Sequence, residues 1–407
     1  MTKQRYFFTV LILGALTALG PFSIDMYLPG FPAIAKSFHI TTAQVSLSLS
    51  SFFVGISVGQ LLYGPLLDRY GRKRPLYIGL VLYIAASIGC FFAADIETLI
   101  LLRFIQAVGS CAAGVASMAM VRDIFPVADN AKIFALLILI LGASPMVAPT
   151  VGGYVTVVWG WHLIFIILAA MAVLILLAVI FALPESHKPD PTHSLKPLPI
   201  INSFLAVIKN AQFFTYALTG AFAFMGLFVY VAGSPLVFME VFKTGAKTYG
   251  WIFAGLSIGF VGSSQVNNVL LRYYKSEQII GVAIVTQVIT TILFVLATLN
   301  GWLGLGGTIC MIFIVLSCVG IANPNASALS LAPFEKNAGT AAALLGAAQL
   351  GLGALASLGI SIFNSQSALP MAGTMAVSAI IALIVLLTGR RFIKSPAKAG
   401  ANVIAGH

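Results

Sequence analysis

Residues 52–74 read FFVGISVGQLLYGPLLDRYGRKR, an apolar run that ends in a cluster of charges. The run begins near residue 44, and a second apolar run, 76–94, follows the charges. Each run is about as long as the ~20 residues that a helix needs to cross ~30 Å of hydrocarbon. The stretch therefore predicts two membrane-spanning helices joined by a short cationic loop.

The composition of the whole chain agrees with a membrane protein. Of its 407 residues, 60% are hydrophobic and only 8% are charged. Soluble domains carry about 25% charged residues, so this chain has too few charges to cover a water-facing surface. Its high content of apolar residues also excludes a disordered chain.

Apolar runs long enough to span a membrane recur along the chain. We predict twelve: 6–28, 44–65, 76–94, 98–120, 132–154, 161–183, 212–238, 249–271, 278–299, 303–324, 338–360 and 369–389. Between the sixth and seventh, five prolines and several polar residues predict a hydrated linker. The domain prediction is a six-helix bundle over 1–184, a linker over 185–211, and a second bundle with a short tail over 212–407. The first run could also be a signal peptide, but it continues past Gly20-Pro21, so we expect an uncleaved span.

The positions of the cations predict the orientation. Of the 22 Lys and Arg residues, Lys36, Lys243 and Lys247 fall on one side, Arg103 falls inside a span, and the remaining 18 fall on the other side. The positive-inside rule places both termini and the linker in the cytoplasm. The net charge of +11 is therefore explained without a nucleic-acid partner, since no basic stripe is present.

The two halves contain a weak repeat. Residues 52–59 read FFVGISVG and residues 252–259 read IFAGLSIG, and the same offset pairs Asp68 with Asn268 and Arg72 with Arg272. Chance similarity between apolar helices is the alternative to duplication, and the register of the following arginine favours duplication. Such repeats predict two bundles related by a pseudo-two-fold axis, with a binding site between them. The paired glycines would let their helices approach closely.

The charged loop carries a family resemblance. Gly64, Asp68, Arg69, Gly71 and Arg72 match the G-x-x-x-D-R-x-G-R-[RK] signature of major facilitator superfamily transporters. The resemblance implies the all-α integral membrane fold of that family, with twelve transmembrane helices in two six-helix bundles. It also implies that residues 64–74, here named the latch loop, make and break contacts as the transporter changes conformation. The alternative is a positively charged loop that only fixes topology.

Three further motifs narrow the resemblance: one is typical of proton-coupled members, one of drug antiporters and one of a single subfamily. Arg103 and Gln106 match the fourth-helix motif R-x-x-Q-G, with Ala107 where glycine is usual. Residues 144–153 resemble the fifth-helix motif G-P-x-x-G-G, with Ala148 in place of its first glycine; the matching residues are Pro145, Pro149, Gly152 and Gly153. Residues 25–29, DMYLP, resemble the signature of the Bcr/CflA drug-resistance subfamily.

Two ionisable residues fall inside predicted spans, Asp25 and Arg103. Their distances from the outer ends of their spans place them within roughly 3 Å of the same depth, at about 1.5 Å per residue. Charges inside a bilayer are costly and usually face a wet cavity or each other. We therefore predict that Asp25 carries a proton and that Arg103 tunes it. The alternatives are a helix-end aspartate at the headgroup boundary and an arginine that only ties helices together.

The predicted function is a proton-coupled multidrug efflux antiporter that exports amphiphilic compounds by alternating access. We expect it as a monomer in the lipid of a bacterial cytoplasmic (inner) membrane, conferring antibiotic resistance. An exporter of a metabolite or sugar in the same subfamily is the alternative, and a membrane sensor or an intramembrane enzyme is a remote one. The residues that we expect to line a substrate cavity are Tyr27, Gln106, Phe222 and Tyr230. The competing explanation is helix packing for Gln106 and packing against lipid for the aromatic residues Phe222 and Tyr230. No cofactor or metal site is predicted, and the absence of a G-x-x-x-x-G-K-[ST] motif argues against coupling to ATP.

Overall fold

The computed structural model describes residues 3–187, 189–190, 197–334, 338–362 and 367–393. Within these residues every regular element is helical, and no strand is present. The all-α prediction is therefore confirmed.

Each predicted span coincides with a long helix in the described part of the chain. The long helices are α1 (Lys3–Asp25), α3 (Thr42–Tyr70), α4 (Lys73–Phe91), α5 (Ile96–Ile124), α6 (Val127–Trp159), α7 (His162–Ala182), α9 (Ala211–Ser234), α10 (Ala246–Leu270), α11 (Ser276–Leu299), α12 (Leu305–Leu331), α13 (Ala338–Ile362) and α14 (Leu369–Gly389). The shorter elements are η1 (Leu28–Gly30), α2 (Phe31–Ser37), α8 (Pro197–Ile208), the π-helical turn η2 (Pro235–Val241) and η3 (Arg390–Phe392).

Eleven helices of the described residues are long and apolar enough to cross a membrane, so the chain is a multi-pass membrane protein. The predicted span that is not among them is α10. Its second half carries Gln265, Asn267 and Asn268, which lower its apolar character although the segment is helical.

Several helices extend beyond the predicted spans, and this changes the latch loop. α3 continues to Tyr70, so Gly64, Asp68 and Arg69 lie on a helix and not in a loop. Gly71, with φ of 83°, and Arg72 make the turn before α4 begins at Lys73. A positive φ of this size is easily adopted only by glycine. The range predicted as a linker likewise contains a helix, α8, while residues 188 and 191–196 of that range lie outside the described residues.

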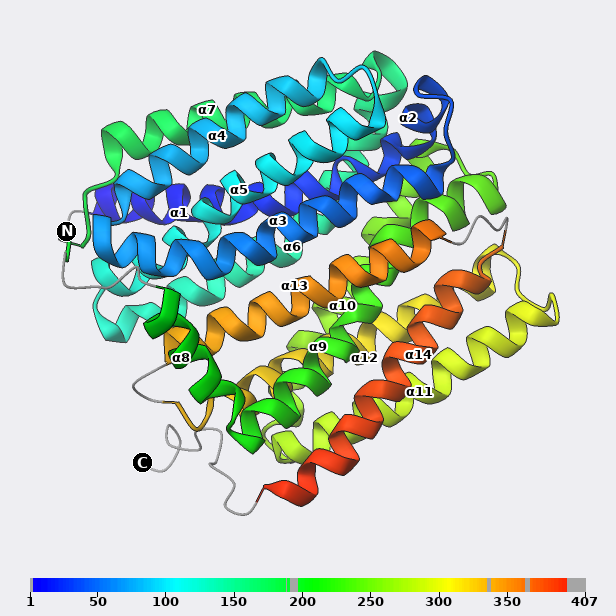
Figure 1. The fold of residues 1–407 in the computed structure, drawn as a ribbon. Coiled ribbons are helices and arrows are strands. Elements are labelled where there is room, and N and C mark those ends of the chain that lie inside the picture. The colour runs from blue at the N-terminus through cyan, green and yellow to red at the C-terminus, as the bar shows by residue number, and fades with distance from the viewer. Residues whose placement is uncertain (1–2, 188, 191–196, 335–337, 363–366, 394–407) are drawn as a thin grey trace. The chain divides into compact units, whose positions relative to one another are not determined.

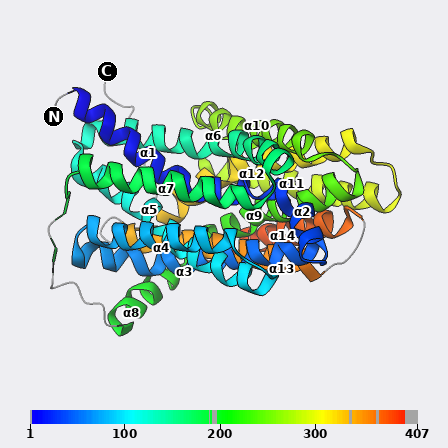
Figure 2. The ribbon, with the colours of Figure 1, turned by 90° about the horizontal axis from the view of Figure 1, so that it is seen from above.

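The chain forms two compact units. Unit 1 comprises Met1–Leu195 and Phe238–Ala254, and unit 2 comprises Lys196–Val237 and Gly255–His407. The long helices of each unit run side by side (Figure 1 and Figure 2). The segment Phe238–Ala254 belongs to the second half of the sequence but packs within unit 1. The predicted division at residues 184 and 212 stays a prediction.

In unit 1, α5 packs closely against both α3 and α4. A Cβ atom on Gly55 would lie 2.7 Å from the Phe104 carbonyl oxygen, and one on Gly59 would lie 2.7 Å from the Cys111 Cβ. These are shorter than van der Waals contacts, so glycine is required for the helices to approach this closely. The predicted close approach at the first G-x-x-x-G pair is therefore confirmed.

In unit 2, α9 packs against α12, α13 and α14, and α11 packs against α12 and α14. A buried apolar cluster that includes Tyr216, Ile284 and Leu329 joins α9, α11, α12 and α14. The second glycine pair is looser than the first. Gly259 approaches Phe313, whereas nothing in the described residues lies within 4 Å of a Cβ placed on Gly255.

Candidate functional site

Asp25 is the last residue of α1, and its side chain is buried, with only 5% exposed. The chain continues from it through η1 and α2, and the whole segment Gln4–Ser37 counts as one candidate span. Asp25 is therefore a helix-end residue, but it lies inside the protein. Among the described residues it is the only buried acid.

Arg103 lies on α5 and is completely buried. Its Nη1 donates to Gln106 Oε1 at 2.6 Å and its Nη2 donates to the Ser23 carbonyl oxygen at 3.0 Å. Its guanidinium carbon lies 4.6 Å from the ring centroid of Tyr27 and 4.1 Å from that of Phe52. Desolvated cation–π contacts contribute about 2 kcal/mol each, so two aromatic faces hold this charge.

Asp25 and Arg103 form no ion pair in the described part of the chain. Arg103 instead donates to Gln106 and to the carbonyl of Ser23, a backbone group two residues before Asp25. The Ser23 side chain faces α4, where its hydroxyl meets that of Tyr83. In this conformation the charge of Arg103 therefore contacts the backbone near the end of α1 and not the carboxylate of Asp25.

The hydrogen bonds around Arg103 connect four helices of unit 1. Gln106 Nε2 donates to Ser87 Oγ on α4 at 2.7 Å. The Tyr27 hydroxyl and Ser48 Oγ on α3 lie 2.8 Å apart, and both Tyr27 and Gln106 are fully buried. Both predicted cavity residues thus have partners within unit 1 and sit beside Arg103.

Ser23 and Tyr83 add a further link between α1 and α4, with their hydroxyl oxygens 2.6 Å apart. Nothing in the sequence pattern singled out Ser23, Ser48, Tyr83 or Ser87. Serine and tyrosine are common inside membrane helices, and only the packing shows which of them meet.

The latch loop is organised around Arg72. Arg72 Nη1 lies 2.6 Å from Asp68 Oδ1, and Arg72 Nε lies 2.7 Å from Asp123 Oδ2 at the end of α5. Burial alone would lower the pKa of Arg72, but hydrogen bonds and charge from Asp123 and Asp68 outweigh it and raise that pKa above its usual value. Arg72 therefore stays a cation and ties the ends of α3 and α5 together.

A third carboxylate, Glu185, secures the start of α4. Its two oxygens accept from the backbone N–H groups of Arg72 at 2.9 Å and Lys73 at 3.1 Å. An anion at a helix N-terminus satisfies free N–H groups and the helix dipole. A Cβ on Gly71 would lie 3.2 Å from Glu185 Oε2, so the tight turn also admits this carboxylate.

Arg69 and Gly64, the other two residues of the signature, lie on α3. The Arg69 guanidinium lies 5.8 Å from the centroid of the Tyr70 ring. Nothing in the described residues lies within 4 Å of a Cβ placed on Gly64. Asp123 and Glu185 were not predicted from the sequence, although they lie only three and two residues beyond the ends of predicted spans, 98–120 and 161–183.

The prolines of the fifth-helix motif, Pro145 and Pro149, lie inside α6, and its glycines face two different neighbours. A Cβ on Gly152 would overlap the Met26 carbonyl oxygen, directly after Asp25. A Cβ on Gly153 would lie 2.5 Å from the Ala246 carbonyl oxygen, in the second segment of unit 1. Both positions therefore exclude any side chain.

The segment Phe238–Ala254 makes further contacts within unit 1. The Thr42 hydroxyl donates to Glu240 Oε1, and the Lys247 ammonium lies 4.8 Å from the centroid of the Tyr154 ring. Glu240 lies in the π-helical turn η2, a type of element that is frequent at functional sites. It was missed because the predicted seventh span ended at residue 238.

Phe222 and Tyr230, the other predicted cavity residues, lie on α9 in unit 2. Phe222 packs against the apolar cluster around Tyr216 and Ile284, and Tyr230 is 1% exposed. In the described residues, no group of three or more His, Cys, Asp or Glu side chains could hold a metal ion.

Comparisons with known proteins agree with this architecture. The family model described as "Major Facilitator Superfamily" matches residues 13–358. An uncharacterised transporter of that type from Bacillus subtilis, YdgK, is 33% identical, over 91% of this chain and 92% of its own. A bicyclomycin resistance protein homologue from Haemophilus influenzae is 30% identical, over 94% of this chain and 96% of its own. The multidrug resistance protein MdtL from Escherichia coli is 27% identical, over 92% of this chain and 93% of its own.

Among solved structures, a D-xylose-proton symporter superposes with a TM-score of 0.74 at 15% identity. The superposition covers 97% of this chain and 99% of the symporter. At this identity the likeness concerns the fold alone.

Proposed function

Because the chain belongs to the major facilitator superfamily, a family of transporters and not of enzymes, we propose that it is a proton-coupled drug antiporter. It exports small amphiphilic compounds across a bacterial cytoplasmic membrane and takes up protons in exchange. The names of the bicyclomycin-resistance and multidrug-resistance relatives support this substrate class. The excess of Lys and Arg on one side supports cytoplasmic termini.

The observation that carries the proposal is the burial of Asp25. A lone carboxylate inside a membrane protein is costly, so intramembrane acids usually belong to ion or proton pathways. Asp25 has no cationic partner within salt-bridge distance in the described residues. Its charge state therefore depends on access to water, and a transporter that opens to alternate sides changes that access. Taking up a proton outside and releasing it inside would drive export.

Arg103 acts in this proposal as a fixed charge that positions the end of α1. Its Nη2 holds the Ser23 carbonyl, two residues before Asp25, and its guanidinium contacts Tyr27, two residues after it. A change in the charge of Asp25 that moves the end of α1 must therefore also disturb the buried Arg103 network. The glycine contact between Gly152 and Met26 passes the same movement to α6.

The latch supplies the conformational part of the mechanism. Arg72 pairs with the carboxylates of Asp68 and Asp123 at the ends of α3 and α5. Glu185, after α7, accepts from the backbone N–H groups at the start of α4. Such contacts break and re-form without unfolding a helix. In the proposed cycle these contacts stabilise one conformation of the transporter and weaken in the other. The transporter works as a monomer in this proposal.

A resistance assay with a matched pair of acid-to-amide variants tests the proposal. The chain is expressed in an efflux-deficient bacterium and the inhibitory concentrations of a panel of amphiphilic antibiotics are measured. The wild type should raise several of them. One proton driven by about 200 mV supplies roughly 4–5 kcal/mol, which limits the sustainable drug gradient to about 10³. Asp25→Asn should abolish the increase, whereas Glu97→Gln, at an exposed acid on α5, should retain it.

Two outcomes would contradict parts of the proposal. Full resistance in Asp25→Asn, at equal abundance in the membrane, would remove Asp25 as the proton carrier. Equal susceptibility with and without the wild-type protein across the panel would remove drugs as substrates and favour an exporter of a metabolite or sugar.

A further inference from the structure

Helix α8 presents an apolar face that no described residue covers. Ile201, Leu205 and Ile208 are 49%, 46% and 38% exposed. Their spacing of four and three residues places them on one side of the helix. A different side anchors α8 to unit 2, where the buried Val207 packs into a cluster with Phe213 and Ala341. The exposed side is therefore held in a fixed position and is not a frayed end.

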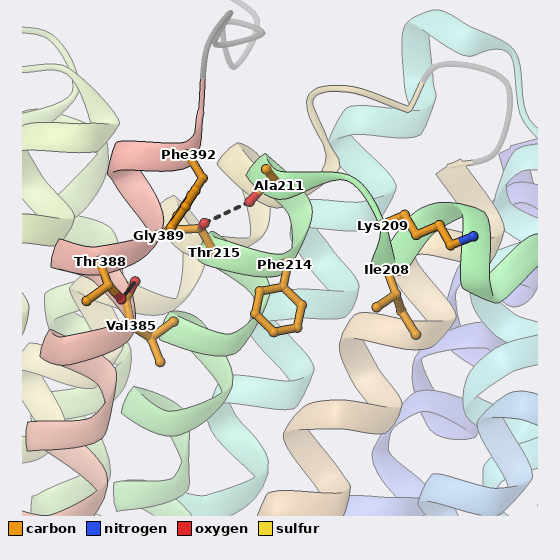
Figure 3. Close-up of a pocket in the computed structure, with 9 residues that line it drawn as sticks. All are labelled: Ile208, Lys209, Ala211, Phe214, Thr215, Val385, Thr388, Gly389 and Phe392. Atoms are coloured by element: carbon orange, nitrogen blue, oxygen red, sulfur yellow. Dashed lines mark hydrogen bonds between the residues drawn. The ribbon is translucent and has the colours of Figure 1, made fainter.

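The apolar face leads into a cavity of about 320 Å³ between the end of α8, the start of α9 and the end of α14. In Figure 3, Phe214 projects between Ile208 on one side and the α14 residues Val385 and Thr388 on the other. Phe392, on η3, lies on the α14 side and is 71% exposed. Large apolar side chains thus surround an open cavity at the end of two membrane helices.

The two threonine hydroxyls that line the cavity are already used in hydrogen bonds within their own helices. The Thr215 hydroxyl donates to the Ala211 carbonyl at 2.7 Å (Figure 3), and the Thr388 hydroxyl donates to the Ile384 carbonyl at 2.7 Å. Both threonines therefore satisfy their hydroxyls on their own helices. The wall suits a hydrocarbon chain better than a polar molecule.

The charge at the cavity is positive. Lys209 is the one charged residue among those that line it, and it is exposed. Arg391, also exposed, directly precedes Phe392. No acidic residue lines the cavity within the described part of the chain. A basic group beside an apolar slot at the end of a membrane helix matches the boundary where phosphate headgroups meet acyl chains.

We infer that this cavity binds an anionic phospholipid. The acyl chain lies against Phe214, Val385 and Ile208, and the phosphate lies beside Lys209. The exposed face of α8 rests on the same leaflet. Because the site lies within unit 2, it depends neither on the proposed antiport reaction nor on the predicted orientation.

Native mass spectrometry of the full-length protein in detergent tests this site directly, without a transport assay. Equimolar phosphatidylglycerol and phosphatidylcholine are added, and retained lipid is counted. The wild type should retain phosphatidylglycerol preferentially. One lysine near a lipid surface contributes about 1 kcal/mol, so Lys209→Gln should lower phosphatidylglycerol retention about fivefold and leave phosphatidylcholine unchanged. Thr388→Trp, which fills the cavity from an exposed position, should lower retention of both lipids.

Lys275→Gln, at an exposed lysine before α11, is the matched control and should retain lipid like the wild type. Unchanged thermal unfolding midpoints would show that the variants are folded. Equal retention of the two lipids by the wild type, or no effect of Lys209→Gln, would overturn the inference. So would stabilisation of the protein by inorganic phosphate equal to that by phosphatidylglycerol, which would indicate a free anion site. A dimer without bound lipid would show that a second copy covers the face.

Discussion

Replacing Asp123 with asparagine removes the more buried of the two carboxylate partners of Arg72 and keeps the shape of the side chain. The Asp123 side chain is 17% exposed, whereas that of Asp68 is 42% exposed. The Arg72 side chain between them is 9% exposed. Both contacts are short, so burial decides their relative strengths.

The expected cost of Asp123→Asn is about 2 kcal/mol, because hydrogen bonds to charged groups contribute about 1.5–3 kcal/mol. Asp68→Asn should cost less than about 1 kcal/mol, since solvent screens an exposed pair. Arg72 cannot avoid the loss by giving up its proton, because an arginine guanidinium stays protonated at neutral pH. A cost of about 2 kcal/mol corresponds to roughly a 30-fold change between states that have and lack this contact.

A double-mutant cycle measures this contact. Free energies of unfolding by denaturant are compared for the wild type, Asp123→Asn, Arg72→Gln and the double variant, and the cycle is repeated with Asp68→Asn. The coupling energy of Arg72 with Asp123 should be about 1.5–3 kcal/mol and should exceed that with Asp68. A coupling below about 0.5 kcal/mol, or the reverse order of the two, would refute the reasoning from burial.

Two pairs of glycine variants test the backbone contacts, each by the thermal unfolding midpoint of the purified protein. Gly71→Ala should cost about 1–2 kcal/mol because its φ of 83° is unfavourable for alanine, whereas Gly64→Ala, on helix α3, should be neutral or slightly stabilising. Gly152→Ala should cost about 1–3 kcal/mol through overlap with the Met26 carbonyl, whereas Gly114→Ala meets no described atom within 4 Å. Equal midpoints within either pair would contradict the corresponding contact.

Much of the latch could be predicted from local sequence. The signature G-x-x-x-D-R-x-G-R-K indicated Asp68, Gly71 and Arg72, and all three have roles in the turn or its ion pairs. Asp123 and Glu185 could not be found in this way. They are 51 and 113 positions from Arg72, and only the packing of α5 and α7 against the other helices brings them to it.

The proposed proton site shows a different limit. The sequence indicated that Asp25 and Arg103 lie at a similar depth, because a helix advances a constant distance per residue. It did not indicate their directions around the helix axes. The structure instead surrounds Arg103 with Tyr27, Phe52 and Gln106, and its contact with α1 is the Ser23 carbonyl and not the Asp25 carboxylate.

The sequence alone determined that this protein lies in a membrane, that it is all-helical and how many long helices it has. Apolar length and the scarcity of charge are properties of each segment alone, and backbone hydrogen bonds in lipid must be satisfied within a helix. Only the tertiary structure decided which polar side chains meet and where Phe238–Ala254 packs. Those outcomes depend on the rotation of each helix about its axis and on contacts between segments far apart in the chain, which no local pattern encodes.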